Sequence, residues 1–123
     1  MLIIRLICAA YCSLLTLMLL LSDPLALLGI KRAAGISQGW GVHFWCFAVL
    51  GLLALASRFP IRSAVLAGGL VGYAVATELL QGFVPLRAVE RGDLIENLLG
   101  LTAAGAVWWV VQKCILRGSQ ETR

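Results

Sequence analysis

The stretch LALASRFPIRSAVL, residues 53–66, decides the fold of this chain because it places a short turn between two long apolar runs. Pro60 disfavours helical geometry at Phe59 and leaves room only for a turn between Arg58 and Arg62. The uncharged runs on either side extend over 33–57 and 63–77. We therefore expect the chain to reverse direction here as a hairpin of two apolar helices.

Two further uncharged runs, 6–22 and 97–112, flank this hairpin. A sixteen-residue helix covers roughly 24 Å of a hydrocarbon core near 30 Å, and flanking Lys and Arg side chains reach the remaining distance. With these flanks we expect spans at approximately 4–22, 40–57, 63–81 and 94–112. The predicted fold is all-α: a single domain over 1–123, built as an integral membrane bundle of four transmembrane helices.

The composition excludes an ordinary soluble domain. Hydrophobic residues make up 61% of the 123 residues and charged residues only 13%, against roughly 25% charged residues in soluble chains. A domain this small could not bury so much apolar surface in water. The ten Lys and Arg are scattered between apolar runs and form no basic stripe, so we expect the lipid bilayer, and not nucleic acid, as the partner.

The cysteines and the N-terminal run raise two alternatives. The cysteines lack the paired close spacing of a zinc site, so we interpret them as packing residues and predict no metal and no cofactor: Cys8, Cys12, Cys46 and Cys114. The run 6–22 is longer than the apolar core of a signal peptide, and no small-x-small cleavage site follows it. We expect this segment to be retained as a span.

Polar residues gather where the apolar runs begin or end. His43 opens the second span, Glu78 and Gln81 close the third, and Asp93 and Asn97 open the fourth. Because successive spans alternate in direction, all of them meet at one interface. The candidate polar site, with an arginine from the connecting segment, is His43, Glu78, Gln81, Arg87, Asp93 and Asn97. We expect Glu78, Arg87, Asp93 and Asn97 to form one hydrogen-bonded site, since charges at an apolar boundary are costly unless paired.

Each of these residues also has an ordinary structural interpretation. A lone interfacial histidine such as His43 is more typical of a hydrogen-bonded anchor than of a catalyst. Glu96, beside the site, suits the positive end of a helix dipole or the lipid headgroups. Glu78 is harder to explain in this way, because it interrupts an apolar face about one turn before the helix ends.

Small residues form two seams that predict close helix packing. Gly68 and Gly72 lie on the third span, and Gly100, Ala104 and Gly105 lie on the fourth. Glycine and alanine let helix backbones approach closely in a membrane. We therefore expect the third and fourth spans to pack against each other through these residues.

A family resemblance rests on the polar residues around the last link: Glu78-Leu79-Leu80-Gln81, then Arg87, Asp93, Asn97, Gly100 and Gly105. This pattern resembles the VanZ-like membrane proteins of bacteria, and His43-Phe44 is similar to that family's His near a helix start. Many members place an acidic-basic pair just before the His, where this chain has Gln38-Gly39-Trp40-Gly41-Val42. The resemblance implies an envelope protein of the bacterial inner membrane, in a family whose namesake is linked to resistance to teicoplanin.

Three functions fit these observations. The first is an envelope factor whose polar site engages a lipid-linked or cell-wall component and affects glycopeptide susceptibility. The second is a membrane enzyme, with His43 or Glu78 as general base and Arg87 or Arg91 holding the phosphate of a polyprenyl-linked substrate. No nucleophile motif specifies a reaction, so the catalytic residues stay undefined. The third is a structural subunit that packs against another membrane protein through its glycine seams.

Basic residues predict the orientation. The face that carries both termini has six of them, and the opposite face has four: Arg5, Arg58, Arg62, Lys113, Arg117 and Arg123 against Lys31, Arg32, Arg87 and Arg91. The positive-inside rule then places both termini in the cytoplasm and the polar site outside. A reporter fused to the C-terminus should behave as cytosolic, and strong periplasmic activity of that fusion would contradict the orientation.

Overall fold

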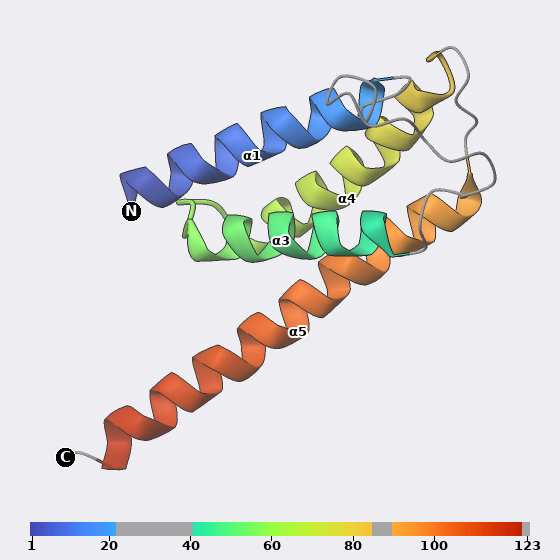
Figure 1. The fold of residues 1–123 in the computed structure, drawn as a ribbon. Coiled ribbons are helices and arrows are strands. Elements are labelled where there is room, and N and C mark those ends of the chain that lie inside the picture. Colours follow the sequence, from blue (N-terminus) through green and yellow to red (C-terminus); the bar gives the residue numbers. More distant parts are fainter. Residues whose placement is uncertain (22–40, 85–89, 122–123) are drawn as a thin grey trace.

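The structure, a computed structural model, describes residues 1–21, 41–84 and 90–121, with side chains described up to Ile115. Within these ranges every regular element is a helix, which confirms the predicted all-α class. The helices are α1 (Leu2–Leu20), α3 (Val42–Ala56), α4 (Ser63–Gln81) and α5 (Arg91–Glu121). Figure 1 shows α1 lying along α3, with α4 running diagonally behind them, while the C-terminal half of α5 extends away from the other helices.

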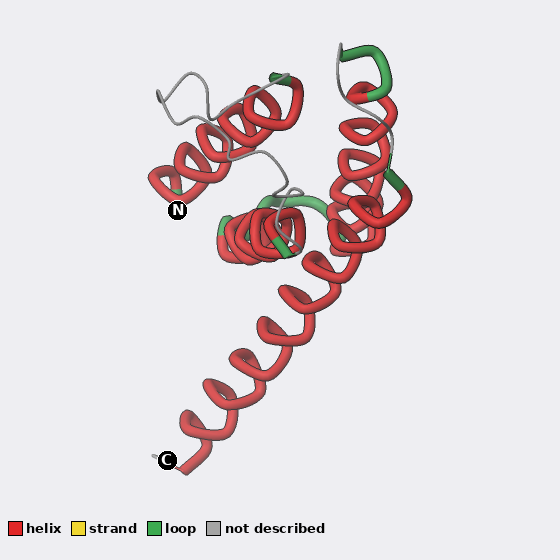
Figure 2. Tube along the Cα trace, turned by 45° about the vertical axis from the view of Figure 1, so that its right-hand side comes forward, coloured by secondary structure: helices red, strands yellow, loops and turns green. Residues whose placement is uncertain are grey.

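The four described helices form a ring of neighbours. α1 packs on α3, α3 on α5, α5 on α4, and α4 back on α1, and the interface between α3 and α5 is the most extensive. The second view shows the same divergence of the C-terminal part of α5 from the other helices (Figure 2). The N-terminal half of α5 therefore belongs to the bundle, whereas its C-terminal half leaves it.

The bounds of α1, α3 and α4 lie within two residues of the predicted spans, whereas α5 differs clearly. α3 begins only at Val42 because Gly41, its N-cap, has a left-handed backbone with φ +100°, which glycine adopts without steric cost. α5 continues to Glu121, well past the predicted end at residue 112. Charged residues mark where a chain leaves an apolar layer, and they do not by themselves break the backbone hydrogen bonds of a helix.

The turn between α3 and α4 is tied to the start of α1. Arg5 donates from Nε to the carbonyl of Ser57 at 3.1 Å and from Nη2 to the carbonyl of Arg58 at 2.9 Å. These carbonyls lie at the C-terminal end of α3, which lacks intrahelical donors and carries the negative end of the helix dipole. Arg5, counted above among the basic residues that predict orientation, therefore also fastens α1 to the end of α3.

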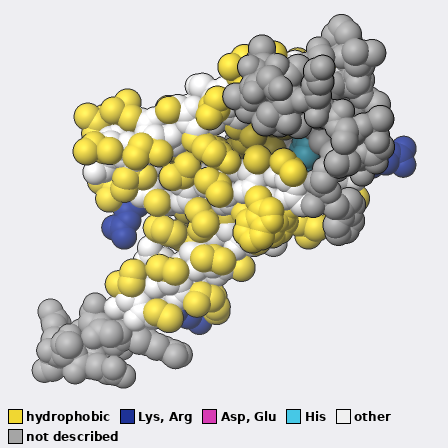
Figure 3. Space-filling model, viewed as in Figure 1, with side chains coloured by type: hydrophobic (Ala, Val, Ile, Leu, Met, Phe, Trp, Pro, Cys, Tyr) yellow, Lys and Arg dark blue, Asp and Glu magenta, His cyan; other side chains and the backbone are white. Residues whose placement is uncertain are grey.

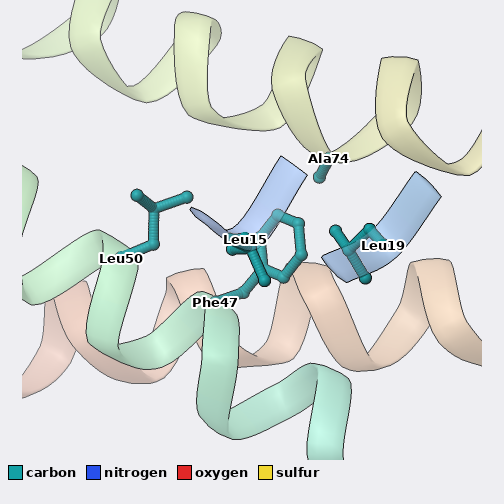
Figure 4. Close-up of a cluster of buried hydrophobic side chains, with 5 residues drawn as sticks. All are labelled: Leu15, Leu19, Phe47, Leu50 and Ala74. Carbon is teal, nitrogen blue, oxygen red and sulfur yellow. The ribbon is translucent and has the colours of Figure 1, made fainter. Parts of the chain in front are cut away.

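A small apolar core joins α1, α3 and α4. Phe47 is fully buried and lies among Leu15 and Leu19 of α1, Leu50 of α3 and Ala74 of α4 (Figure 4). Its ring is 5.8 Å from that of Tyr73, centroid to centroid. Burying an aromatic side chain of this size stabilises a fold by about 1.5–3 kcal/mol, so Phe47 is the main anchor of this part of the bundle.

Most of the outer surface is apolar. Hydrophobic side chains cover much of the visible face in Figure 3, and large residues such as Leu6, Trp45, Val65 and Ile95 are more than half exposed. Three helical stretches are long and apolar enough to cross a membrane: Leu2–Leu20, Ser63–Gln81 and Arg91–Ile115. α3 is equally apolar but spans only 15 residues.

Close backbone packing occurs between α3 and α5. A Cβ added at Gly100 would overlap the carbonyl oxygen of Phe44 and lie 2.9 Å from the backbone nitrogen of Ala48. One turn further along, a Cβ at Gly51 would lie 2.7 Å from the Cβ of Ala104. Gly100 and Ala104 therefore form a packing seam as predicted, but their main partner is α3.

The other predicted seam residues do not take part in helix packing. A Cβ added at Gly68, Gly72 or Gly105 would meet no described atom within 4 Å. Gly105 instead lines an apolar cleft of about 450 Å³ between α3, α4 and α5. α4 and α5 do pack on each other as predicted, but not through these glycines, because α5 turns its seam toward α3.

Substituting Gly100 should separate α3 from α5. Gly100→Ala places a methyl group against fixed backbone atoms of α3, and overpacking of this kind typically costs about 1–3 kcal/mol. Thermal unfolding of the detergent-extracted protein should show a lower midpoint. The matched control is Gly72→Ala on α4, where the new Cβ meets open space and the midpoint should stay constant or rise slightly. Equal losses in both variants would contradict the assigned seam.

Candidate functional site

A polar cluster lies where the start of α3, the end of α4 and the start of α5 meet. Nδ1 of His43 is 3.2 Å from Oδ1 of Asn97, and Nε2 of the same ring is 3.4 Å from Oδ2 of Asp93. His43 and Asn97 are almost completely buried, whereas the Asp93 side chain is 20% exposed. His43 is thus the residue that joins two side chains of α5 across the helix interface.

Spacing along each helix explains this geometry. Asp93 and Asn97 are four residues apart, so they lie on one face of α5, one turn above the other. His43 occupies the first turn of α3, directly before Phe44, whose carbonyl faces Gly100. The close approach of the two backbones at Gly100 therefore brings the imidazole within reach of both α5 side chains.

Glu78 is the residue that α4 adds to the polar cluster, and it is only 3% exposed. Its Oε1 accepts a hydrogen bond of 2.9 Å from the backbone N–H of Glu90, just before α5. The carbonyl of Glu90 in turn accepts the backbone N–H of Asp93 at 3.1 Å. Its second oxygen, Oε2, is buried and has no hydrogen-bond partner within the described ranges. Glu78 therefore belongs to the cluster, although no direct hydrogen bond joins it to Asp93 or Asn97 among the described contacts.

Two neighbouring polar residues serve helix ends instead. Gln81 is buried and donates from Nε2 to the carbonyl of Leu19 at 3.1 Å, which satisfies an acceptor at the C-terminus of α1. Glu96 accepts the backbone N–H of Gly41 at 3.0 Å, at the start of α3. Gln81 was predicted as part of the polar site, and the structure directs its amide toward α1.

The structure describes only part of the predicted hydrogen-bonded network. Arg87, expected as the partner of Glu78 and Asp93, lies outside the described residues. Asp93 finds its described partner in His43, a residue whose sequence context alone favoured a simple anchor. No signal in the sequence ranked His43 above the arginine, because the contact depends on how α3 packs on α5. From here on, polar site refers to the four described residues that cluster, and no longer to all six predicted ones: His43, Glu78, Asp93 and Asn97.

The arrangement suits recognition of a polar group. A neutral imidazole donates from one ring nitrogen only, so His43 satisfies both Asn97 and Asp93 as N–H donor only when protonated. In either form both ring nitrogens face a partner. Among the described residues there is no group of three or more His, Cys, Asp and Glu side chains placed to hold a metal ion. Among the buried side-chain atoms of the described residues, the acceptor that remains open is Oε2 of Glu78.

Comparisons with models of protein families, with curated proteins and with solved structures find no match to this chain.

Removing the Asn97 side chain should destabilise the junction of α3 and α5. Asn97→Ala leaves the buried Nδ1 of His43 without its partner, and an unsatisfied buried polar group costs about 1–3 kcal/mol. The matched control is Thr102→Ala on the same helix, because among the described residues that exposed hydroxyl bonds to the carbonyl of Leu98, one turn away on α5 itself. Thermal unfolding in detergent should show a clearly larger loss for Asn97→Ala. Indistinguishable midpoints would mean that the contact between His43 and Asn97 carries no stability.

Proposed function

We propose that this chain is an integral membrane protein of four spans whose polar site engages the polar part of a lipid-linked or cell-wall component. The observation that carries the proposal is the near-complete burial of His43, Glu78 and Asn97 at one end of otherwise apolar helices. Ionisable side chains within membrane helices are costly, and they usually mark a pathway or a binding site.

The helix dimensions support a membrane setting. From Asp93 to Lys113 α5 rises about 30 Å, which equals the usual thickness of the hydrocarbon core. Lys113 lies over the ring of Trp109, with Nζ 3.9 Å from the centroid, as expected for residues at a membrane interface. α3, at 15 residues, covers only about 22 Å. A short α3 would place His43 slightly below the interface, where the other helices shield it from lipid.

Binding is favoured over catalysis by the contacts of His43. A general base needs a ring nitrogen within reach of the proton it accepts. Both nitrogens of His43 already face side chains of α5, namely Asp93 and Asn97. These contacts suit a residue that positions the side chains of a binding site. We therefore propose the envelope factor as the function and keep the membrane enzyme as the alternative.

The VanZ-like sequence pattern supports a location in the inner membrane of a bacterium, with both termini cytoplasmic and the polar site external. On that basis we further propose that the bound component belongs to the cell envelope and that its engagement affects susceptibility to teicoplanin. Three described residues of the pattern, Asp93, Asn97 and Gly100, lie on the α3-facing side of α5. The others that are described are Glu78 and Gln81 on α4 and Gly105 on α5.

Loss of the polar site should abolish the effect without removing the protein. In a strain lacking the gene, wild-type chain should restore the teicoplanin phenotype, whereas Asp93→Asn should behave like the deletion at normal membrane abundance. Asp93→Asn keeps the shape of the side chain and removes its charge. Thr102→Ala should restore the phenotype fully. An Asp93→Asn chain that restores it equally well would contradict a functional role for the site.

Native mass spectrometry provides the direct test of binding. The wild-type protein, extracted with its surrounding lipid, should retain a lipid-linked species that Asp93→Asn loses and Thr102→Ala keeps. Turnover of such a species by the purified wild-type protein would instead establish the enzyme alternative.

A further inference from the structure

One oxygen of Glu78 is placed to accept a hydrogen bond that no described residue supplies. The side chain is 3% exposed, and Oε1 is already paired with the backbone N–H of Glu90. Oε2 is buried and unpaired within the described ranges, although an unpaired buried acceptor is normally costly. Because Glu90, the partner of Oε1, also accepts the backbone N–H of Asp93 through its carbonyl, this free acceptor lies beside Asp93 and belongs to the polar site.

The charges around this acceptor select the kind of group that can fill it. The described ionisable side chains at this end of the bundle are Glu78, Glu90, Asp93 and Glu96 on the acidic side, with His43 and Arg91 on the basic side. A phosphate would bring further acceptor oxygens to an atom that itself lacks a donor, and negative charge to described side chains that are mostly acidic. An N–H donor with positive charge complements the site in both respects.

Building on the proposed function, we propose that the polar site binds a primary ammonium group, which donates one N–H to Oε2 of Glu78. A primary ammonium has three donors and no acceptor, so it can bond to Glu78 and still face Asp93, which is partly exposed at the edge of the site. A quaternary ammonium carries the same charge but has no N–H to donate. The ligand class is thus an amine, carried either by a lipid or by a water-soluble molecule.

Single-chain amphiphiles test this inference. The full chain is reconstituted in phosphatidylcholine nanodiscs, whose own headgroups lack an N–H donor, and its thermal unfolding midpoint is followed during titration. Dodecylamine should raise the midpoint saturably by a few degrees, because a ligand that binds only the folded state stabilises it. Dodecyltrimethylammonium and dodecyl phosphate should give no saturable rise. Ethylamine, which stays in water, separates the sources: a rise with both amines indicates a water-borne amine, and a rise with dodecylamine alone indicates a lipid-borne one.

Two variants assign the effect to Glu78. Glu78→Gln keeps an oxygen for the N–H of Glu90 and replaces the open acceptor with a donor, so it should lose most of the dodecylamine shift. Glu96→Gln is the matched control, since it removes the same charge at the same end from a carboxylate that already has Gly41 as partner. It should keep the shift. If Glu78→Gln does not fold, the wild-type chain still provides the test. A saturable rise of the midpoint with dodecylamine but not with dodecyltrimethylammonium supports the ammonium site, and equal responses overturn it.

The outcomes separate this inference from the proposed function. A rise with dodecyl phosphate but not with dodecylamine, lost in Asp93→Asn, would overturn the amine and leave a headgroup-binding site. A dodecylamine effect that appears only in Arg87→Gln would also overturn it, because the chain's own arginine would then be the partner of Glu78. If no amphiphile acts in a way that depends on Glu78 or Asp93, both the inference and the proposed function fail.

Discussion

The contact between the backbones of α3 and α5 at Gly100 is the constraint on which the rest of the structure depends. The missing side chain at Gly100 lets α5 rest directly on the carbonyl of Phe44 and the backbone of Ala48. Phe44 follows His43, and Asn97 lies one turn before Gly100. The same close approach therefore fixes the distance between the imidazole and the amide at 3.2 Å. A wider helix spacing would break the packing and the polar site together.

At both ends of the bundle, side chains from one helix satisfy the end of another. The last carbonyls of a helix have no intrahelical donor and need partners from elsewhere. At one end Gln81 donates to Leu19 of α1, and at the other Arg5 donates to Ser57 and Arg58 after α3. These cross-helix bonds join elements distant in the sequence, so the polar side chains stabilise the bundle as well as forming a site.

Glu78 differs from these structural polar residues in that one of its oxygens stays open within the described part of the chain. Gln81, one turn further along α4, has its amide engaged with α1, and Glu96 has its carboxylate engaged with Gly41. A buried acceptor beside an acid and a histidine is costly for folding alone. This cost is understandable if the residue is kept for a ligand, which is the basis of the proposed ammonium site.

The sequence by itself determined the helices and the end of the bundle at which the polar residues gather. The apolar runs and the turn at Pro60 set where α1 and α4 lie, and alternation of direction brings His43, Glu78 and Asp93 to one end. The tertiary structure alone decided which of these residues touch. Gly68 and Gly100 are equally small, yet only Gly100 meets another backbone, because the rotation of each helix about its axis follows from the packing of all its neighbours. For the same reason the central position of His43 and the open oxygen of Glu78 emerged only from the packed helices: spacing along one helix defines a face, but only the assembled bundle defines what that face contacts.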